Sequence, residues 1–382
     1  MTNDQLLQHF AAMYQASASG MASAPGRVNL IGEHTDYNQG FVLPCSLNFR
    51  TKVLFRARTD RQLVVHSLNY PGEHDSFALD KPVQSGPSQW GNYVRAMAFV
   101  LQRAGHQLPG ADLLIYSDVP QGAGLSSSAA LEVAVGGVFS QLANLQLSPE
   151  QIALFGQQAE NDFMDCQCGI MDQLISAKGQ PGQALMIDCQ DLSSTAVPVP
   201  AGLALVIINS NYPRKLVESE YNQRRQDCEQ AAVKMAMPSL RHATLAMLNA
   251  HQSVLTETEL KRARHVISEN QRVLAAVTAL QQQDMAALRQ LMAASHQSLQ
   301  QDFAVTVPAT DGLVEICQSA LGERAAARMT GGGFGGAIVC LCPTDAVDVL
   351  TSAVQAQYQP RFGLQADIYV CQAGTGLAVE LI

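Results

Sequence analysis

The chain has 382 residues, of which 47% are apolar and 15% charged, and its formal net charge is −9. A chain of this length exceeds what one hydrophobic core usually serves, so we expect two domains with a cleft between them. The acidic balance argues against a nucleic-acid or anionic-membrane partner. The N-terminus lacks the pattern of a signal peptide, and no apolar segment approaches the roughly 20 residues that span a bilayer. These features predict a cytoplasmic enzyme or binding protein.

The cysteines number nine, an odd count, and they lie in apolar surroundings such as residues 338–342. We expect reduced and mostly buried thiols. Cys166 and Cys168 have neither the CxxC spacing nor a second cluster beside them, so we do not expect a metal site there.

The first third of the chain predicts a short helix over residues 3–17, a turn over 17–25 and a strand over 27–31. The next segment, 32–36, is too polar for a core strand and is interpreted as a loop that presents side chains. A strand over 111–116, a glycine loop over 120–124 and a helix over 126–145 then follow one another.

A second helix is predicted from Ser148 to about residue 162, with Ser148 as N-cap, Pro149 at the first helical position and Gln151 completing a capping box. The proline-rich stretch 197–200 is the best domain boundary. We therefore divide the chain into domains 1–200 and 201–382.

The C-terminal half alternates helices and strands, which indicates an α+β layered fold. The predicted elements are a strand over 202–209, a helix over 215–235, helices near 257–300 and 308–321, a strand over 327–330, a glycine run over 331–336, a strand over 337–341, a helix over 345–358 and a strand over 367–371.

The segment 122–129, Gly-Ala-Gly-Leu-Ser-Ser-Ser-Ala, joins the predicted strand to the predicted helix. Free backbone N–H groups and the positive end of the helix dipole make such a junction an anion site. Its glycines allow close approach of phosphate, and its hydroxyls can bind phosphate or Mg²⁺. The segment is neither a P-loop nor a dinucleotide fingerprint. A capped helix after a flexible turn is the alternative.

A second glycine run, 331–336, has five glycines in six positions between two predicted strands. A hairpin turn needs only two or three residues. We therefore expect the backbone here to approach a ligand or the first glycine loop closely, with a simple turn as the alternative.

The segment 26–37 combines Arg27, Glu33, His34 and Asp36 with hydroxyl groups, the mixture of donors and acceptors that sugar recognition needs. Phosphoryl transfer also needs a carboxylate to hold Mg²⁺ and an oriented hydroxyl, often with a second carboxylate. Glu160 and Asp172 fit those two roles. The alternatives are that His34 is the histidine of a capped turn and that Glu160 and Asp172 are ordinary surface acids.

Three segments together, 25–38, 122–129 and 329–336, resemble the GHMP small-molecule kinase superfamily and, within it, most closely the galactokinase family. The resemblance covers essentially the whole chain, and the first motif, with Gly-Glu-His-Thr-Asp-Tyr, is the one specific to galactokinases and near relatives. It implies a two-domain α+β GHMP kinase fold, with a ribosomal protein S5 domain 2-like N-terminal domain and a ferredoxin-like C-terminal domain.

The resemblance also implies the reaction, which is transfer of the ATP γ-phosphate to the C1 hydroxyl of α-D-galactose, giving α-D-galactose 1-phosphate and ADP. The implied ligands are galactose, ATP and Mg²⁺, and we expect a monomer. The resemblance implies that the arginine matching Arg27 lowers the pKa of that hydroxyl or stabilises the transferring phosphoryl group, and that the aspartate matching Asp172 acts as base.

The implied site residues fall into four groups. Those for catalysis are Asp172 and Arg27, those for the sugar are Glu33, His34, Thr35, Asp36 and Tyr221, those for ATP are Gly122, Ala123, Gly124, Leu125, Ser126, Ser127 and Ser128, and those for Mg²⁺ are Ser128 and Glu160. The adenine pocket has weaker candidates, which are Trp90, Asn92 and residues 67–70.

Three other functions compete with this interpretation. One is a kinase for a related sugar such as N-acetylgalactosamine or arabinose, because discrimination depends on pocket shape around one substituent. Another is a non-enzymatic sugar sensor on the same scaffold, which the intact serine run 126–128 disfavours. A structural protein would leave the joint occurrence of three motifs unexplained.

Overall fold

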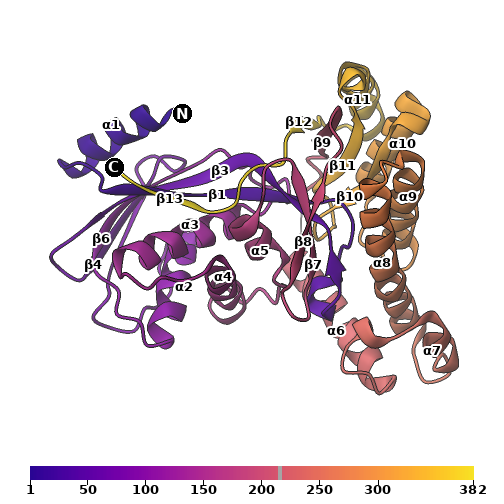
Figure 1. Ribbon diagram of the computed structural model, residues 1–382, viewed down its shortest axis with the longest axis horizontal. Coiled ribbons are helices and arrows are strands. Elements are labelled where there is room, and N and C mark those ends of the chain that lie inside the picture. The colour runs from indigo at the N-terminus through magenta and orange to yellow at the C-terminus, as the bar shows by residue number, and fades with distance from the viewer. Residues whose placement is uncertain (214–216) are drawn as a thin grey trace.

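Three β-sheets and the helices packed on them form the fold of this computed structural model, which describes residues 1–213 and 217–382 (Figure 1). The strands are β1 (Gly20–Asn29), β2 (Phe41–Val42), β3 (Pro44–Ala57), β4 (Gln62–Ser67), β5 (His74–Ala78), β6 (Ala111–Ser117), β7 (Gln183–Asp188), β8 (Ser194–Pro198), β9 (Leu203–Asn209), β10 (Ala326–Thr330), β11 (Ala337–Pro343), β12 (Asp367–Cys371) and β13 (Ala378–Leu381). The α-helices are α1 (Asn3–Tyr14), α2 (Gln89–Arg103), α3 (Ser127–Leu142), α4 (Pro149–Asp162), α5 (Met171–Lys178), α6 (Val217–Lys234), α7 (Leu245–Ala250), α8 (Glu257–Gln281), α9 (Met285–Gln301), α10 (Pro308–Leu321) and α11 (Val347–Phe362).

The largest sheet has the order β13-β1-β3-β6-β4-β5, and only its β4–β6 pair is parallel. Helix α1 covers one face and α2 to α5 cover the other (Figure 1). Successive strand residues point to opposite faces. Accordingly Leu54 and Leu114 pack with Leu6 and Phe10 of α1, whereas neighbouring strand residues belong to the core on the α3 side.

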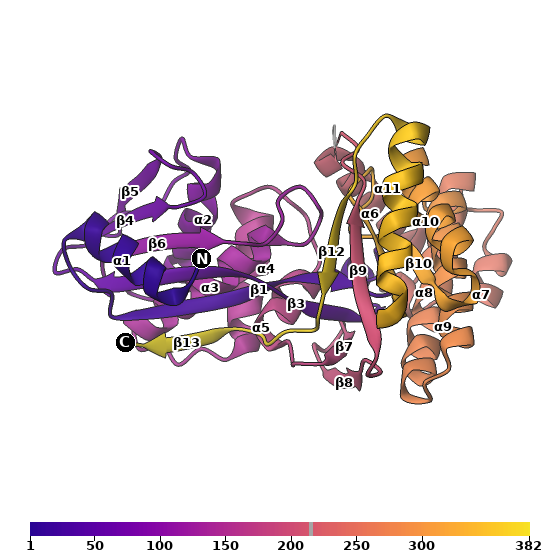
Figure 2. The ribbon, with the colours of Figure 1, turned by 90° about the horizontal axis from the view of Figure 1, so that it is seen from above.

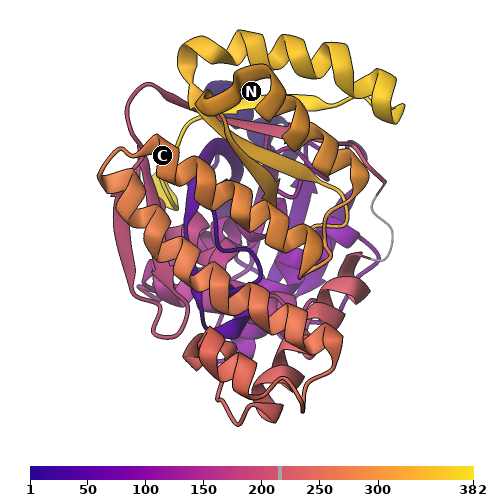
Figure 3. The same ribbon diagram turned by 90° about the vertical axis from the view of Figure 1, so that its right-hand side faces the viewer.

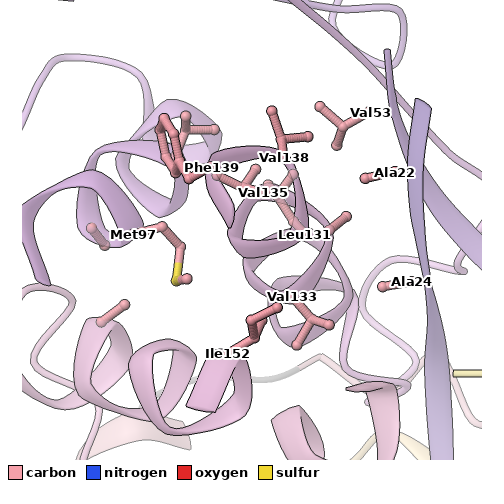
Figure 4. Packing of buried hydrophobic residues seen from close by; sticks show 14 of the residues in the cluster. Ala22, Ala24, Val53, Met97, Leu131, Val133, Val135, Val138, Phe139 and Ile152 are labelled. Atoms are coloured by element: carbon pink, nitrogen blue, oxygen red, sulfur yellow. The ribbon is translucent and has the colours of Figure 1, made fainter. Parts of the chain in front are cut away.

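Strand β1, which lies between β13 and β3 in the sheet, packs directly against α3. Ala22 and Ala24 are fully buried in the same cluster as Val135 and Val138 of the helix (Figure 4). The predicted turn over 17–25 is therefore wrong, because most of it is the first half of β1. The small residues that suggested a turn instead let the helix approach the strand closely, so tertiary packing decides the conformation.

The second sheet is antiparallel, with the order β10-β11-β9-β12. One face packs on α10 and α11, through residues such as Ile208, Ile338 and Leu313. The other face, including Ile207 and Val339, belongs to a core that also contains the end of β1 and parts of α8 and α9. Figure 3 shows α8 to α11 layered over this side of the molecule. The segment after β1 is thereby enclosed between the two main sheets.

The last strand returns to the first sheet. β13 pairs antiparallel with β1, with Gly20 opposite Leu381, so the two ends of the chain lie in one half of the molecule (Figure 2). The division of the chain at residue 200 stays a prediction.

Most other predicted elements are confirmed. Helix α4 has the expected capping box between Ser148 and Gln151. The N-terminal helix ends at Tyr14, before the predicted residue 17, because Gln15 adopts a left-handed conformation with φ of 51°. The region near 257–300 is two helices, and Asp284 caps the second. Helix α6 begins at Val217, and the predicted start at residue 215 lies outside the described residues. The α+β prediction is confirmed.

Candidate active site

Three cavities meet around the loop between β6 and α3. The loop cavity, about 270 Å³, is lined by Gly122, Gly124 and residues 125–128 with Pro120, Arg27, Asp172 and Gly332. The acidic cavity, about 200 Å³, shares with it Arg27, Ser128, Asp172 and Gly332. The aromatic cavity, about 380 Å³, includes Tyr70, Trp90 and Tyr93 and also reaches Ser127 and Ser128. Ser128 lines all three.

Most of the predicted site residues meet in these cavities. The acidic cavity brings together Arg27, Glu33, His34, Asp36, Ser128, Glu160, Asp172 and Tyr221. Of the residues in the four predicted groups, two do not line any of the three cavities. Thr35 is fully buried, and its hydroxyl lies 2.8 Å from the carbonyl oxygen of Gly32 and 2.6 Å from that of Phe41, so its single proton is committed to these carbonyls and helps to shape the loop after β1. Ala123 points into the core.

Asp172 and Arg27 form a bidentate ion pair at the junction of the acidic and loop cavities. Nε of Arg27 donates to Oδ1 of Asp172 at 2.7 Å and Nη2 donates to Oδ2 at 2.8 Å. The Arg27 side chain is 7% exposed, whereas that of Asp172 is 31% exposed. Nη1 of Arg27 also donates to the carbonyl of Gly124 at 2.6 Å. The arginine therefore holds the carboxylate and the glycine loop in one fixed geometry, while the carboxylate keeps an open side.

Glu33 is held by a residue that the sequence analysis missed. Arg328, on β10, is fully buried and its Nη2 donates to Oε1 of Glu33 at 2.6 Å. The same Oε1 accepts from the hydroxyl of Thr330 and from the backbone N–H of Gly331. A single arginine in an apolar strand just before a glycine run is the sequence signal that could have indicated this contact.

The glycine run 331–336 contacts the first motif, which was not predicted, and it also approaches the first glycine loop as expected, since a Cβ on Gly331 would lie 3.5 Å from the carbonyl oxygen of Gly124. Besides the bond from Gly331 to Glu33, Gly331 and Gly332 line the acidic cavity. Gly333 has a φ of +83°, and a Cβ there would lie 2.5 Å from the carbonyl oxygen of Val305. Close approach, more than turn geometry, explains the glycine at this position.

Aromatic rings surround His34. Its ring centroid lies 4.7 Å from that of Phe303, 5.3 Å from that of Tyr221 and 5.8 Å from that of Tyr37. Nδ1 of His34 is 2.8 Å from the hydroxyl of Tyr37. Burial holds the pKa of His34 well below its usual range, so the imidazole is neutral. Phe303 had no role in the sequence-based prediction of the site, whereas Tyr37 entered it only as part of the first motif.

Asp36 has an unusual environment at the edge of the acidic cavity. Burial, followed by the negative charge of Asp172, raises its pKa to about 7. Gly169 lies against the carboxyl group, and a Cβ there would be 2.1 Å from Oδ2 of Asp36. The cavity wall therefore needs glycine at this point, and the protonation of Asp36 changes near neutral pH.

The aromatic cavity contains most of the residues suggested for adenine. Ser67, Asn69, Tyr70 and Trp90 line it, and the rings of Tyr70 and Trp90 are within 7° of parallel. Asn92 does not line it, because its side chain exchanges hydrogen bonds with the backbone of Gly86.

Family models match three segments of the chain. They are the galactokinase galactose-binding signature over residues 8–57, the GHMP kinases N terminal domain over 92–180 and the GHMP kinases C terminal region over 276–359. The three predicted motifs fall within or beside these segments.

Solved structures agree with the family models. A galactokinase from Lactococcus lactis, complexed with galactose, is 36% identical, and the match covers 98% of this chain and 99% of that chain with a TM-score of 0.94. A mevalonate kinase from Methanococcus jannaschii is 15% identical over 93% of this chain and 98% of that one, with a TM-score of 0.68. A homoserine kinase from Cytophaga hutchinsonii is 17% identical over 96% and 98%, with a TM-score of 0.61. The last two show the fold alone.

The fold is thus that of a GHMP kinase, as the sequence predicted. The chain is also 36% identical to a galactokinase over nearly its full length. It therefore belongs to the galactokinase family. It is an ATP-dependent sugar kinase with galactokinase function. In residues 1–213 and 217–382, no helix is both long and apolar enough to cross a membrane.

Removing the buried arginine should destabilise the protein strongly. Arg328→Met leaves the Glu33 carboxylate without its charged partner, and breaking a buried ion pair costs about 3–5 kcal/mol. Arg361→Met is a matched control, because Arg361 pairs with Glu315 at the same 2.6 Å but both side chains are well exposed. That control should lose less than about 1 kcal/mol. Urea denaturation measures both variants, and equal small losses would contradict a supporting role for Arg328.

Proposed function

We propose that Asp172 and Arg27 lie where the γ-phosphate of ATP passes to the C1 hydroxyl of α-D-galactose, giving α-D-galactose 1-phosphate and ADP. The observation that carries this proposal is that both residues line the acidic cavity and the loop cavity at once. A sugar in the first cavity and a phosphate chain in the second would meet at this ion pair.

The acidic cavity suits a sugar with several hydroxyl groups. Carboxylates of Glu33 and Asp36 can accept from hydroxyls, and the Tyr221 ring supplies an apolar wall. Among the described residues, Nε2 of His34 has no hydrogen-bond partner, so it is available to a ligand. In this proposal Thr35 acts by holding the loop, since its hydroxyl is already engaged with two carbonyls.

Asp172 has the geometry of a base for the C1 hydroxyl. It would accept a hydrogen bond from that hydroxyl and take its proton as the new P–O bond forms and the bond to ADP breaks. Arg27 keeps the carboxylate in place through two hydrogen bonds and places positive charge beside the transferring phosphoryl group. Orientation is the main task of Asp172, because the loose transition state of phosphoryl transfer needs little advance removal of the proton.

The ATP phosphates fit the loop cavity, where the backbone of Gly122–Ser128 leads into the N-terminus of α3. The helix dipole favours negative charge there. The aromatic cavity joins the loop cavity at Ser127 and Ser128, so we assign the adenine ring to the side of Tyr70 and Trp90. Flat aromatic rings offer a base a stacking surface.

Ser128 and Glu160 fit a Mg²⁺ site. Both line the acidic cavity, and Ser128 also reaches the loop cavity where the phosphates would lie. In the part of the chain that is described, no group of three or more His, Cys, Asp or Glu could hold a metal ion. Mg²⁺ in kinases uses one or two protein carboxylates and completes its shell with phosphate oxygens and water, so Glu160 and the hydroxyl of Ser128 would be enough protein ligands. Bound there, Mg²⁺ would neutralise phosphate charge.

The cysteines and the net charge support the predictions about the cellular compartment and the partners in part. All nine cysteines are free and most are buried, which suits a reducing, cytoplasmic compartment. The net charge of −9 does not suit a nucleic-acid partner. The monomeric state and the domain boundary at residue 200 remain proposals.

Replacing the proposed base should abolish most turnover without unfolding the protein. Asp172→Asn removes the proton acceptor, and general-base catalysis contributes roughly 10²–10⁴-fold. A coupled assay of ADP release with galactose and Mg-ATP measures the loss, and calorimetry should show ATP binding retained. Asp188→Asn is the control, since Asp188 is another aspartate held by two hydrogen bonds from one arginine, and it lies outside the three cavities. Turnover by the Asp172 variant at the rate of the control would remove Asp172 from the mechanism.

Loss of the Glu160 carboxylate should raise the Mg²⁺ requirement. For Glu160→Gln we expect the Mg²⁺ concentration giving half-maximal rate to rise at least about tenfold, as loss of even an outer-shell partner costs about 10–100-fold in metal affinity. Glu150→Gln, on the same helix but paired with Lys178, should leave the requirement unchanged. Titration of Mg²⁺ at fixed ATP compares the two. An unchanged requirement in the Glu160 variant would place the ion elsewhere.

Galactose recognition should depend on pH through Asp36. Its raised pKa of about 7 means that the carboxyl is neutral below and ionised above that pH. An ionised carboxylate accepts stronger hydrogen bonds from sugar hydroxyls. We therefore expect KM for galactose to fall, by roughly fivefold, as pH rises from 6 to 8.

Asp36→Asn removes the titrating group and serves as the reference for every other pH effect in the assay. Its KM for galactose should be higher than that of the native protein at pH 8 and should change little with pH. Parallel pH profiles for the two proteins would show that Asp36 does not titrate in contact with the sugar.

A further inference from the structure

Ser126 occupies the N-cap position of α3 but does not cap the helix. Its backbone is left-handed, with φ of 57° and ψ of 52°, and its side chain makes no capping hydrogen bond. Serine normally serves at this position by accepting a bond from the first turn of the helix. The left-handed conformation is also unfavourable for a residue with a Cβ. Something other than helix capping explains a serine here.

The hydroxyl of Ser126 instead donates to Oδ2 of Asp172. A serine hydroxyl has one proton, so it cannot donate to Asp172 and to an ATP phosphate together. Arg27 links the same loop to the same carboxylate, because its backbone N–H donates to the carbonyl of Leu125 at 3.0 Å and Nη1 donates to that of Gly124. The glycine loop, the arginine and the aspartate form one hydrogen-bonded unit.

The two oxygens of Asp172 are unequally occupied. Oδ2 accepts two hydrogen bonds, one from Nη2 of Arg27 and one from the hydroxyl of Ser126. Of the described residues, only Arg27 donates to Oδ1, through Nε at 2.7 Å. Oδ1 therefore has the open position for an incoming hydroxyl.

We propose that Ser126 is a positioning residue, which commits its hydroxyl to Oδ2 of Asp172 and so leaves Oδ1 as the atom that receives the proton of the sugar hydroxyl. This inference rests on the proposed role of Asp172 as base. It also changes the expected part of Ser126 in ATP binding, because a hydroxyl that donates its proton to Asp172 has none left to donate to a phosphate. The hydroxyl acts on the transfer step and not on nucleotide affinity.

Two substitutions that differ in backbone preference test the proposal. Ser126→Gly removes the hydroxyl and relaxes the left-handed backbone, whereas Ser126→Ala removes the hydroxyl and keeps the strain. Both variants lose a hydrogen bond to a charged carboxylate, and such bonds are stronger than those between neutral groups. We therefore expect kcat to fall about tenfold in both variants. KM for galactose and the Kd of a non-hydrolysable ATP analogue, measured by calorimetry, should stay within about twofold of the native values.

Asn144→Gly is the matched control. Asn144 is also left-handed, with φ of 53°, and lies just beyond the other end of α3 on the exposed surface, so this variant should retain native kcat. A loss of analogue affinity in both Ser126 variants that matches or exceeds their loss of kcat would assign the hydroxyl to phosphate and overturn the proposal. A loss of kcat in the alanine variant alone would assign the effect to the backbone, which also overturns it.

Asp172→Asn, measured beside these variants, separates this inference from the proposed function. Native turnover in that variant would refute the role of Asp172 itself. Impaired turnover there, combined with native kcat in both Ser126 variants, would refute only the positioning role of Ser126.

Discussion

The buried ion pair between Arg328 and Glu33 is the interaction on which the geometry of the site depends. Arg328 also donates to the carbonyls of Asn29 and Leu30, so one fully buried side chain from the second sheet fixes the end of β1 and the loop after it. Burying a charge is costly unless every group is paired. The cost is offset here because Glu33 accepts from Thr330 and Gly331 as well. The result is a rigid junction between the two halves of the molecule.

That junction explains how the proposed catalytic pair is positioned. Arg27 lies on β1, two residues before Asn29, and its partner Asp172 is in the first turn of α5. Arg328 anchors β1 from one side and the packing of Ala22 and Ala24 against α3 holds it from the other (Figure 4). The phosphate loop immediately precedes α3. The strand therefore sets the distance between the loop, the arginine and the aspartate.

A left-handed backbone and an unusual ionisation state both occur among the residues that line the three cavities. His34 and Ser126 both have a left-handed backbone although neither is glycine, and both belong to the cavities or their loops. Asp36 has a raised pKa because it is buried near two other carboxylates. Such features persist only where surrounding structure holds them, which here is the junction of the two sheets.

The sequence alone determined the local features: the capping box of α4, the strands around the glycine run, and the three motifs whose resemblance indicated a galactokinase. These depend on neighbouring residues, so they can be read from one segment. Tertiary structure alone decided that residues 20–25 form a core strand, that Arg328 reaches Glu33 across almost 300 positions, and that the hydroxyl of Ser126 meets Asp172. Each of these results depends on contacts between distant segments, whose partners are set by how the two sheets pack and not by local composition.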